Sequence, residues 1–498
     1  MTMLDIRLSP TDQRPKPAFL DGEAKQLLIG DTWVPAISGR TIDAVDPTTQ
    51  HTIASFAAAG PEDVDTAVAA ARLAFTNTEW SGIRPDRRGR LLLQISELLE
   101  RHADELAELE SLDMGGPLGL TTWMVQHAAE VFRHYAGWPT KIYGQTAPSD
   151  PSHFNYTLRQ PHGVVAGVYA WNGPLLQMSY KAAPALATGN TVVLKPAEAA
   201  SLTTLRFGEL LAESELPPGV VNIITGYGAE AGEALVTHRD VDKVTFTGSG
   251  RVGRHILEMS TNNLKRVTLE LGGKSPTIVF ADADLNAAAA AAAVGFCAGS
   301  GQGCVAGSRI LVQESVRDQF IDLLVKEMAA YTLGDPFHPE AAMGPMVTRE
   351  HFQRVSSYVE LARDEGATVM VSGTVPDAGG LFIAPTLLTD VTMDMRVVQE
   401  EIFGPVAALM SFSDVDQAIA LGNDVPYGLA SSVWTRDLST AHLVAARLQA
   451  GTVWINTYGE MSAGILPFGG FKQSGIGREH GTQVLDAFTE TKSVVVQL

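Results

Sequence analysis

One cysteine lies in a loop that could present it as a nucleophile. Cys304 follows the Gly-Gln-Gly segment 301–303, between an alanine-rich stretch and the apolar run 309–312. Glycine allows the backbone to approach a ligand closely, so a thiol in such a loop can face the floor of a cleft. The alternative is an inert buried thiol, which is the commoner role of a free cysteine. The other cysteine, Cys297, lies in a predicted helix, where a packing role is expected.

A glycine-rich segment could bind a phosphate. Gly248, Ser249 and Gly253 belong to a Gly-x-Gly-x-x-Gly pattern that follows the predicted strand 243–247 and opens a predicted helix. This pattern in this context is typical of dinucleotide binding, with the phosphate at the helix N-terminus. The same interpretation assigns an acidic residue about twenty positions later, here Glu270, to ribose. Because Glu270 also lies at a predicted domain junction, where catalytic groups are common, the pattern leaves both roles open.

Polar side chains also follow two other apolar runs. Lys195 and Glu198 stand at the end of one run, and Trp171 and Asn172 follow another. Ligands of open parallel sheets bind at the carboxyl ends of the strands, where these residues are expected. Lys195 and Glu198 could equally form a solvated pair. Asn172 could donate a hydrogen bond to an oxyanion or only stabilise a turn.

The elements that must position these residues form two α/β units. Apolar residues recur at three- and four-residue spacing in 61–75 and 86–114, which predicts amphipathic helices. Further along, short β-branched runs alternate with helical stretches, which predicts parallel sheets with crossover helices joined near 270–273. The β-rich end, 493–496, is expected to pair with a sheet edge in this chain or in a partner subunit. The predicted strands are 164–169, 191–194, 220–225 and 243–247, then 277–280, 309–312, 368–371, 407–412, 431–435 and 452–456.

Composition narrows the function classes. The chain has 498 residues and a net charge of -20, a sign that disfavours nucleic acid and anionic membranes as partners. Two cysteines cannot form a disulfide framework, and the longest run without polar side chains, 287–299, is too short to span a bilayer. No cluster of His and Cys has metal-ligand spacing, so no metal is expected. A cytoplasmic protein is therefore expected.

The order and spacing of the motifs along the chain carry more information than any single motif. Seven of them together resemble the aldehyde dehydrogenase superfamily, in its non-acylating, NAD(P)-dependent type, over roughly residues 25 to 498. The motifs are Trp171-Asn172-x-Pro174, Leu194-Lys195-Pro196-x-Glu198, Phe246-Thr247-Gly248-Ser249, Glu270-Leu271-Gly272-Gly273-Lys274, Gly301-Gln302-x-Cys304, Glu401-Ile402-Phe403-Gly404-Pro405 and Pro467-Phe468-Gly469-Gly470-x-Lys472-x-Ser474-Gly475.

The resemblance implies a role for each catalytic candidate. Cys304 would attack the aldehyde carbon to form a thiohemiacetal, with the oxyanion held by the Asn172 amide and the Cys304 backbone N–H. After hydride transfer, Glu270 would activate water to hydrolyse the thioester, and this role replaces the ribose assignment. Glu479 matches an acid linked to proton relay, with a structural pairing to Lys or Arg as the alternative.

The resemblance also implies NAD as the cofactor. A carboxylate at Glu198 would repel the 2′-phosphate of NADP, although the adjacent Lys195 weakens this exclusion and keeps NADP as the alternative. The implied cofactor-binding residues are Trp171, Lys195, Glu198, Gly248, Ser249, Glu401 and Phe403.

Several positions depart from the family pattern. Ala170 stands where proline usually precedes Trp171, which is expected to loosen the turn that presents Asn172. Gly173 and Gly303 replace larger side chains beside the reacting groups, so we expect room for a bulky apolar or aromatic aldehyde. The expected pocket residues are Gly173, Gln177, Tyr180, Trp123 and Tyr458.

The implied fold is a Rossmann-type cofactor domain, an α/β catalytic domain and a small β arm for oligomerisation, in a homodimer or homotetramer. The expected boundaries are 1–24 for an N-terminal arm, 25–141 and 161–270 for the NAD-binding domain, 271–485 for the catalytic domain, and 142–160 with 486–498 for the oligomerisation arm.

Three other functions compete with aldehyde oxidation to the acid. A CoA-acylating semialdehyde dehydrogenase of the same superfamily typically lacks the acid at Glu270. A non-catalytic NAD-binding structural relative would not need Cys304, Glu270 and Asn172 together. A thiol hydrolase requires a histidine base beside Cys304, and none of the twelve histidines lies in a motif of that kind.

Overall fold

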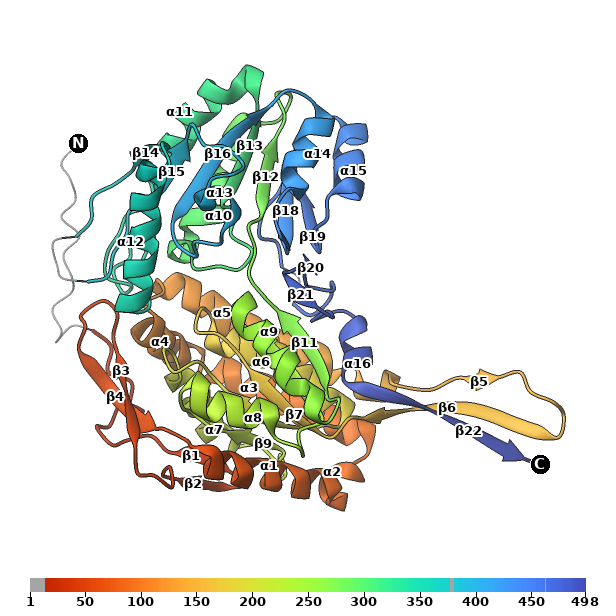
Figure 1. Ribbon diagram of the computed structural model, residues 1–498. Coiled ribbons are helices and arrows are strands. Elements are labelled where there is room, and N and C mark those ends of the chain that lie inside the picture. The colour runs from red at the N-terminus through yellow and green to blue at the C-terminus, as the bar shows by residue number, and fades with distance from the viewer. Residues whose placement is uncertain (1–13, 377–379, 462) are drawn as a thin grey trace.

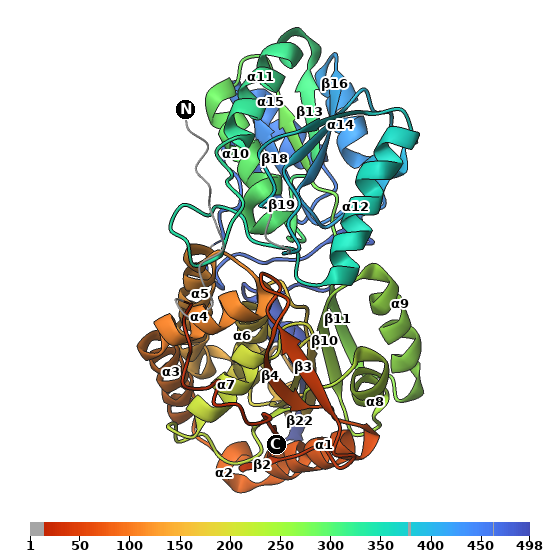
Figure 2. The same cartoon turned by 90° about the vertical axis from the view of Figure 1, so that its left-hand side faces the viewer.

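The computed structural model describes residues 14–376, 380–461 and 463–498, which form two α/β bodies and a projecting arm (Figure 1). In both views the body that contains β12–β19 lies above the body that contains β7–β11 (Figure 2). The predicted N-terminal arm, 1–24, falls largely on residues 1–13, which lie outside the described part of the chain. The matching structures reported below confirm the predicted fold class.

The first body is built on an eight-stranded sheet in the order β2-β1-β9-β8-β7-β10-β11-β21. Its central strands β9, β8, β7, β10 and β11 run parallel, and β2, β1 and β21 add antiparallel edges. The strands are β1 Leu27–Ile29, β2 Thr32–Val34, β7 Val164–Val168, β8 Thr191–Lys195, β9 Val221–Ile223, β10 Lys243–Thr247, β11 Arg266–Glu270 and β21 Gly475–Ile476.

Both faces of this sheet are covered, as continuous apolar strands require. Val164 and Ala166 of β7 pack on one side with residues of α1, whereas Val165 packs on the other with residues of α5 and α6. The predicted helix 86–114 is two helices that break at His102. The helices of this body are α1 Pro61–Thr76, α2 Thr78–Ser81, α3 Pro85–Arg101, α4 Ala103–Met114, α5 Leu118–Ala136, α6 Pro174–Thr188, α7 Leu202–Leu211, α8 Glu233–Thr237 and α9 Gly250–Met259, and a separate ribbon joins β3 Thr41–Val45 to β4 Thr52–Ala57.

The second body is built on a seven-stranded sheet in the order β14-β15-β16-β13-β12-β18-β19, parallel except for β14. Alternate residues again enter different cores, since Ile278 and Val279 of β12 belong to separate apolar clusters. The strands are β12 Pro276–Val279, β13 Arg309–Gln313, β14 Thr368–Val371, β15 Thr386–Thr389, β16 Val406–Phe412, β18 Ala430–Trp434 and β19 Thr452–Ile455. The helices are α10 Leu285–Cys297, α11 Arg317–Met328, α12 Arg349–Asp364, α13 Arg396–Gln399, α14 Val415–Asn423 and α15 Leu438–Arg447.

The arm is a three-stranded antiparallel sheet that extends away from the first body (Figure 1). Its strands are β5 Thr146–Ala147, β6 His153–Pro161 and β22 Thr489–Gln497, and α16 Gln483–Ala487 precedes β22. The β-rich C-terminus therefore pairs with β6 of its own chain, from Thr489 opposite Pro161 to Gln497 opposite His153. A short pair, β17 Tyr427–Gly428 with β20 Phe471–Lys472, lies near the junction of the bodies. In the described chain, no helix has the length and apolar character needed to cross a membrane.

Candidate active site

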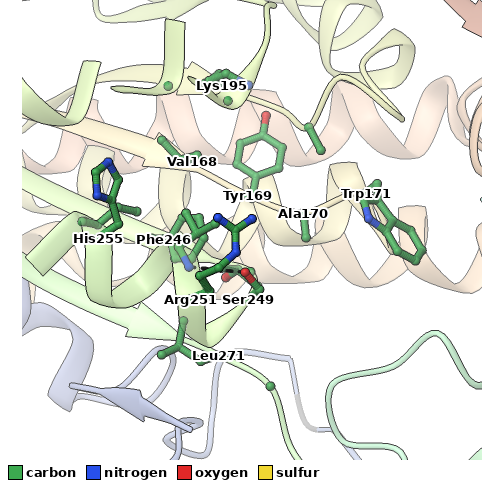
Figure 3. Close-up of a pocket in the computed structure, with 18 of the residues that line it drawn as sticks. Val168, Tyr169, Ala170, Trp171, Lys195, Phe246, Ser249, Arg251, His255 and Leu271 are labelled. Atoms are coloured by element: carbon green, nitrogen blue, oxygen red, sulfur yellow. Dashed lines mark hydrogen bonds between the residues drawn. The ribbon is translucent and has the colours of Figure 1, made fainter. Parts of the chain in front are cut away.

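A cleft of about 1130 Å³ gathers segments from both bodies. The predicted residues that line it are Trp171, Asn172, Lys195, Glu198, Gly248, Ser249, Glu270, Cys304, Glu401 and Phe403. Figure 3 shows residues from the ends of three neighbouring strands around it, among them Trp171, Lys195 and Ser249. The cleft thus brings together residues that are up to 235 positions apart in the chain, from Val168 to Phe403.

The two bodies present opposite edges of their sheets to this cleft. In the first body, Trp171 and Asn172 follow β7, Lys195 ends β8 and Glu270 ends β11, so these residues lie at the carboxyl edge. In the second body, Cys304 lies before β13, and the segment 401–403 lies before β16. The parallel sheet of the second body therefore offers its amino edge.

A left-handed turn positions the cysteine loop. Gly299, Ser300 and Gly301 have φ values of 56°, 57° and 68°, directly after α10 ends. Glycine is required at 301, because an added Cβ would lie 2.2 Å from the Gly404 carbonyl oxygen. Gln302 then fixes the loop, since its Oε1 accepts from the Val347 N–H at 3.0 Å.

The Asn172 side chain reaches this loop from the other body. Its Nδ2 donates to the Gln302 carbonyl at 2.9 Å, two residues before Cys304. An amide nitrogen carries two N–H groups. Within the described part of the chain only one of them has an acceptor, so the second can serve a ligand oxygen near Cys304. This is the arrangement an oxyanion site needs.

The Cys304 thiol lies in a setting that disfavours its charge. Burial and, to a smaller extent, the carboxylates of Glu401 and Glu270 together raise the pKa of Cys304 to about 12. Only backbone hydrogen bonds at 304 and 305 act in the opposite direction. The thiol is thus protonated near neutral pH and needs a base before it can act as a nucleophile.

Glu270 is a buried carboxyl group at the end of β11, 4% exposed. Among the described residues neither of its side-chain oxygens has a hydrogen-bond partner. Burial raises the pKa of Glu270 well above its usual value, and the nearby Glu479 raises it further. A carboxyl group held in this way is a stronger base once it ionises, which suits proton abstraction.

Glu479 forms a buried ion pair with a lysine that the sequence analysis did not select. The Lys181 Nζ lies 2.7 Å from the Glu479 Oε1 and also donates to the Thr247 hydroxyl at 2.7 Å. This contact provides the pairing that was given as the alternative for Glu479. Lys181 is the single charged residue of helix α6, and this was the sequence signal that could have identified it.

The cofactor side of the cleft has the features a dinucleotide needs. Ser249 caps α9, with its side chain accepting from the Val252 N–H at 3.4 Å, so the first turn of a helix faces the cleft. Lys195 is buried, which lowers its pKa to about 8, and its Nζ lies 3.8 Å from the Glu198 Oε2. Within the described residues, no group of three or more His, Cys, Asp and Glu side chains could hold a metal ion.

Glu401 and Phe403 complete that side from the second body. The Glu401 Oε1 accepts from the Gly273 N–H at 2.9 Å, and burial raises the pKa of Glu401 to about 7. Phe403, with a φ of 62°, packs edge-on against the Trp171 ring at 5.4 Å between centroids. His351 lies against both rings; it was not predicted, and no sequence motif marks it.

The five residues predicted for the aldehyde pocket have different surroundings. Gln177 donates from Nε2 to the Asn172 Oδ1 at 2.7 Å, and the Tyr458 hydroxyl donates to the Val305 carbonyl at 2.9 Å. A Cβ added at Gly173 would lie 3.5 Å from the Met124 sulfur.

The other two pocket candidates flank a histidine on α5. Trp123 is 40% exposed and lies 5.0 Å from the His127 ring, which in turn meets the buried Tyr180 at 6.3 Å. Tyr180 also packs edge-on against His480 at 4.1 Å between centroids. His127 and His480 are further residues that the sequence analysis missed, although His480 directly follows the selected Glu479.

Comparison with known proteins identifies the relationship. The family model described as the aldehyde dehydrogenase family matches residues 33–494. The chain belongs to the aldehyde dehydrogenase family. It is an oxidoreductase that acts on aldehydes, as the resemblance implied.

Individual aldehyde dehydrogenases are similar over nearly their whole length. One from Aspergillus niger is 45% identical over 487 residues, covering 98% of this chain and 96% of that protein. The NAD+ complex of an aldehyde dehydrogenase from Bacillus cereus has a TM-score of 0.94 at 44% identity and covers 99% of this chain and 100% of that one. An indole-3-acetaldehyde dehydrogenase from P. syringae, in complex with NAD+ and IAA, has a TM-score of 0.94 at 39% identity, covering 96% and 98%.

Proposed function

We propose that this aldehyde dehydrogenase oxidises its aldehyde to the carboxylic acid with NAD+, through a covalent intermediate on Cys304. The observation that carries the proposal is the convergence of Cys304, Asn172 and Glu270 on one cleft from opposite sheet edges. A nucleophile, an oxyanion donor and a base are the parts that acyl chemistry of this kind requires.

The first step forms a carbon–sulfur bond. The Cys304 thiol first gives its proton to solvent; its Sγ then attacks the carbonyl carbon, and the carbonyl electron pair moves onto oxygen. The free N–H of the Asn172 amide and the Cys304 backbone N–H stabilise that oxyanion in the thiohemiacetal. When bound, NAD+ supplies the acceptor for the hydride that leaves this carbon.

The second step releases the acid. Glu270 takes a proton from water, the resulting oxygen nucleophile attacks the thioester, and the carbon–sulfur bond breaks to return the thiol. The raised pKa of Glu270 supports the role of a base, and the presence of this acid argues against transfer to CoA. Retention of Cys304, Glu270 and Asn172 together argues against a non-catalytic relative.

The cleft residues fit NAD. Ser249 and the first turn of α9 would hold the pyrophosphate, Lys195 and Glu198 the adenine-side ribose, and Glu401 the other ribose. The Glu198 carboxylate would repel a 2′-phosphate, and this favours NAD over NADP. The NAD+ complexes of the B. cereus and P. syringae enzymes support the same choice.

We further propose that the aldehyde is bulky and apolar or aromatic. A Cβ added at Gly303 meets nothing within 4 Å, so there is open space directly beside the nucleophile. Tyr458 bonds to the Val305 carbonyl next to Cys304, and Tyr180 also lies near enough to interact with Cys304, so both supply aromatic surface there, while Trp123 lies farther out, beyond His127. The similarity to an enzyme named for indole-3-acetaldehyde supports this class.

Assembly through the arm is also proposed, with the domain boundaries given above. Phe154 and Leu158 of β6 are 46% and 39% exposed, and Val496 stands opposite Phe154 on the same face. An exposed apolar face on a thin projecting sheet is typical of a subunit contact. Replacing Phe154 and Leu158 by Asp should then lower the mass measured by light scattering, and an unchanged mass would contradict the assignment.

The central test replaces the nucleophile. Cys304→Ala should abolish NADH formation across a panel of aliphatic and aromatic aldehydes, while NAD+ binding measured by fluorescence titration stays within about twofold, since the thiol acts only on the aldehyde. Cys297→Ala, at the buried end of α10, is the matched control and should keep its turnover. Full activity in Cys304→Ala would refute the covalent mechanism, and highest efficiency on acetaldehyde would refute the bulky substrate.

A further inference from the structure

We infer that Gln177 is a positioning residue that sets the orientation of the Asn172 amide; the inference rests on the proposed function of Asn172 as the oxyanion donor. Gln177 lies in the first turn of α6 and is only 8% exposed. Its Nε2 donates to the Asn172 Oδ1 at 2.7 Å, and its Oε1 accepts from the Ala170 backbone N–H at 3.0 Å. Both ends of one buried amide are therefore engaged beside the catalytic asparagine.

The direction of each bond in this series of hydrogen bonds follows from its first donor, the Ala170 N–H. A backbone N–H can only donate, so Gln177 must turn its oxygen toward Ala170. The NH₂ end of Gln177 then faces Asn172, which must answer with its own oxygen. That leaves the Asn172 NH₂ group directed at the Gln302 carbonyl and the cysteine loop.

The orientation matters because the two ends of an amide have opposite polarity. If Asn172 were reversed, its carbonyl oxygen would face both the Gln302 carbonyl and the developing oxyanion. Two lone pairs would then oppose the negative charge instead of an N–H stabilising it. An asparagine without a fixed neighbour could sample both orientations, whereas Gln177 holds the productive one.

The same network gives Ala170 a purpose. Family members usually have proline here, and proline has no backbone N–H to donate. Ala170 was expected to loosen the turn that presents Asn172; instead its N–H starts the chain of hydrogen bonds that fixes Asn172. Ala170 and Gln177 thus act as a pair, and the loss of either member should remove the same effect.

A double-mutant cycle tests the pair. Gln177→Met keeps the length and removes both hydrogen bonds, Ala170→Pro removes the N–H, and Ala170→Gly, the control, keeps it. We expect kcat to fall about tenfold in Gln177→Met and in Ala170→Pro, a fraction of the loss caused by deleting an oxyanion donor. KM for aldehyde and NAD+ affinity should stay within about twofold, since a positioning role acts on the transition state.

The double variant decides the outcome. If the residues form one network, Ala170→Pro with Gln177→Met should be no slower than Gln177→Met alone, and Ala170→Gly should retain wild-type kcat. Losses that multiply, or full kcat in Gln177→Met, would overturn the inference, and this second result decides alone if Ala170→Pro does not fold. If the wild-type protein forms no NADH with any aldehyde, the proposed function fails instead. The coupling of Ala170 and Gln177 is then tested by the melting temperatures of the two single variants and the double variant, and shifts that add would overturn the inference.

Discussion

The two sheets of this enzyme contribute to one cleft in opposite ways. The first places Lys195 and Glu270 at the ends of parallel strands, where ligands of open α/β sheets normally bind. The second places Cys304 and Glu401 in loops that enter the strands, at the amino edge. One body thus presents the usual binding edge of its fold to the proposed cofactor site, and the other presents its opposite edge, which carries the proposed nucleophile.

This difference separates two kinds of contact. The carboxyl edge of the first sheet offers strand ends and the start of α9 for phosphate and ribose. The amino edge of the second offers a left-handed turn that precedes a half-buried thiol lining the cleft. Substitutions at the first edge should therefore change the constants for the cofactor, and substitutions at the second edge should change those for the aldehyde. Glu270 is the exception: it belongs to the first sheet, but it ends β11 next to the second body and should affect the chemical step.

Glu270→Gln should give the largest effect. Loss of the base should lower steady-state turnover by about 10²- to 10⁴-fold, because water is no longer activated at the thioester. Stopped-flow absorbance should still show a first burst of NADH equal to the enzyme concentration. Wild-type turnover in this variant would place the base elsewhere.

The pH profile should sharpen the assignment of the chemical groups. The pKa values of Glu270 and Cys304 are both raised, and both groups act in their deprotonated forms. Hence kcat/KM should increase as pH rises from 6 to 9, by up to about tenfold per unit while the controlling group is protonated. Initial rates in buffers of constant ionic strength measure it, and NAD+ affinity should follow a different profile. A decline across this range would contradict the assignment.

Gly303→Leu should affect the nucleophile side alone. The side chain would fill the open space beside Cys304. KM for an arylacetaldehyde should rise about tenfold, the cost of displacing a few buried methylene groups, while KM for acetaldehyde and for NAD+ stays near the wild-type value. Equal effects on large and small aldehydes would show that the space does not receive the substrate.

Glu198→Gln should affect the cofactor side alone. Removing this partly exposed carboxylate should improve kcat/KM for NADP+ about fivefold, a surface-charge effect of roughly 1 kcal/mol, with little change for aldehyde. Glu230→Gln is the matched control, because Glu230 also lines the cleft and its partner is Arg40 instead of Lys195. An equal gain in both variants would point to the net charge of the cleft.

The smallest effect concerns stability outside both edges. Burial raises the pKa of Glu110 on α4 from 4.5 to about 8. The folded state therefore binds the Glu110 proton more tightly than the unfolded state does. The resulting contribution to the free energy of unfolding is complete below pH 4.5 and is lost as pH rises through 8. Glu110→Gln should raise the melting temperature over wild type by about 2 °C at pH 9 and not at pH 5. The exposed Asp104→Asn on the same helix is the control; a shift independent of pH would contradict the assignment.

Much of the cofactor half could be predicted from sequence rules. Strand ends followed by polar residues identified Lys195 and Asn172, and the glycine pattern identified Ser249. The loop sequence alone left Cys304 as either a nucleophile or an inert buried thiol, because the rule for parallel sheets places ligands at the opposite edge. The role of nucleophile was implied only by the resemblance to the family.

The residues that were missed depend on contacts between distant segments. Lys181 pairs with Glu479 across 298 positions, and His351 on α12 meets Phe403 in the loop before β16. Gln177 was selected as a pocket residue, and its hydrogen bond to Asn172 was not predicted. The direction of a side chain at the start of a helix depends on its neighbours in space, and local spacing contains no record of them.

The short segment between β11 and β12 connects the two bodies and also lies beside the proposed reaction centre. A Cβ at Gly272 would lie 2.0 Å from the Glu401 carboxylate, and one at Gly273 would lie 2.5 Å from the Cys304 carbonyl oxygen. The backbone between Glu270 and the second sheet thus passes directly between the Glu401 carboxylate and the Cys304 backbone. A change in the backbone between β11 and β12 would therefore displace Glu401 and Cys304 directly, so the reaction geometry depends on the rigidity of this connection.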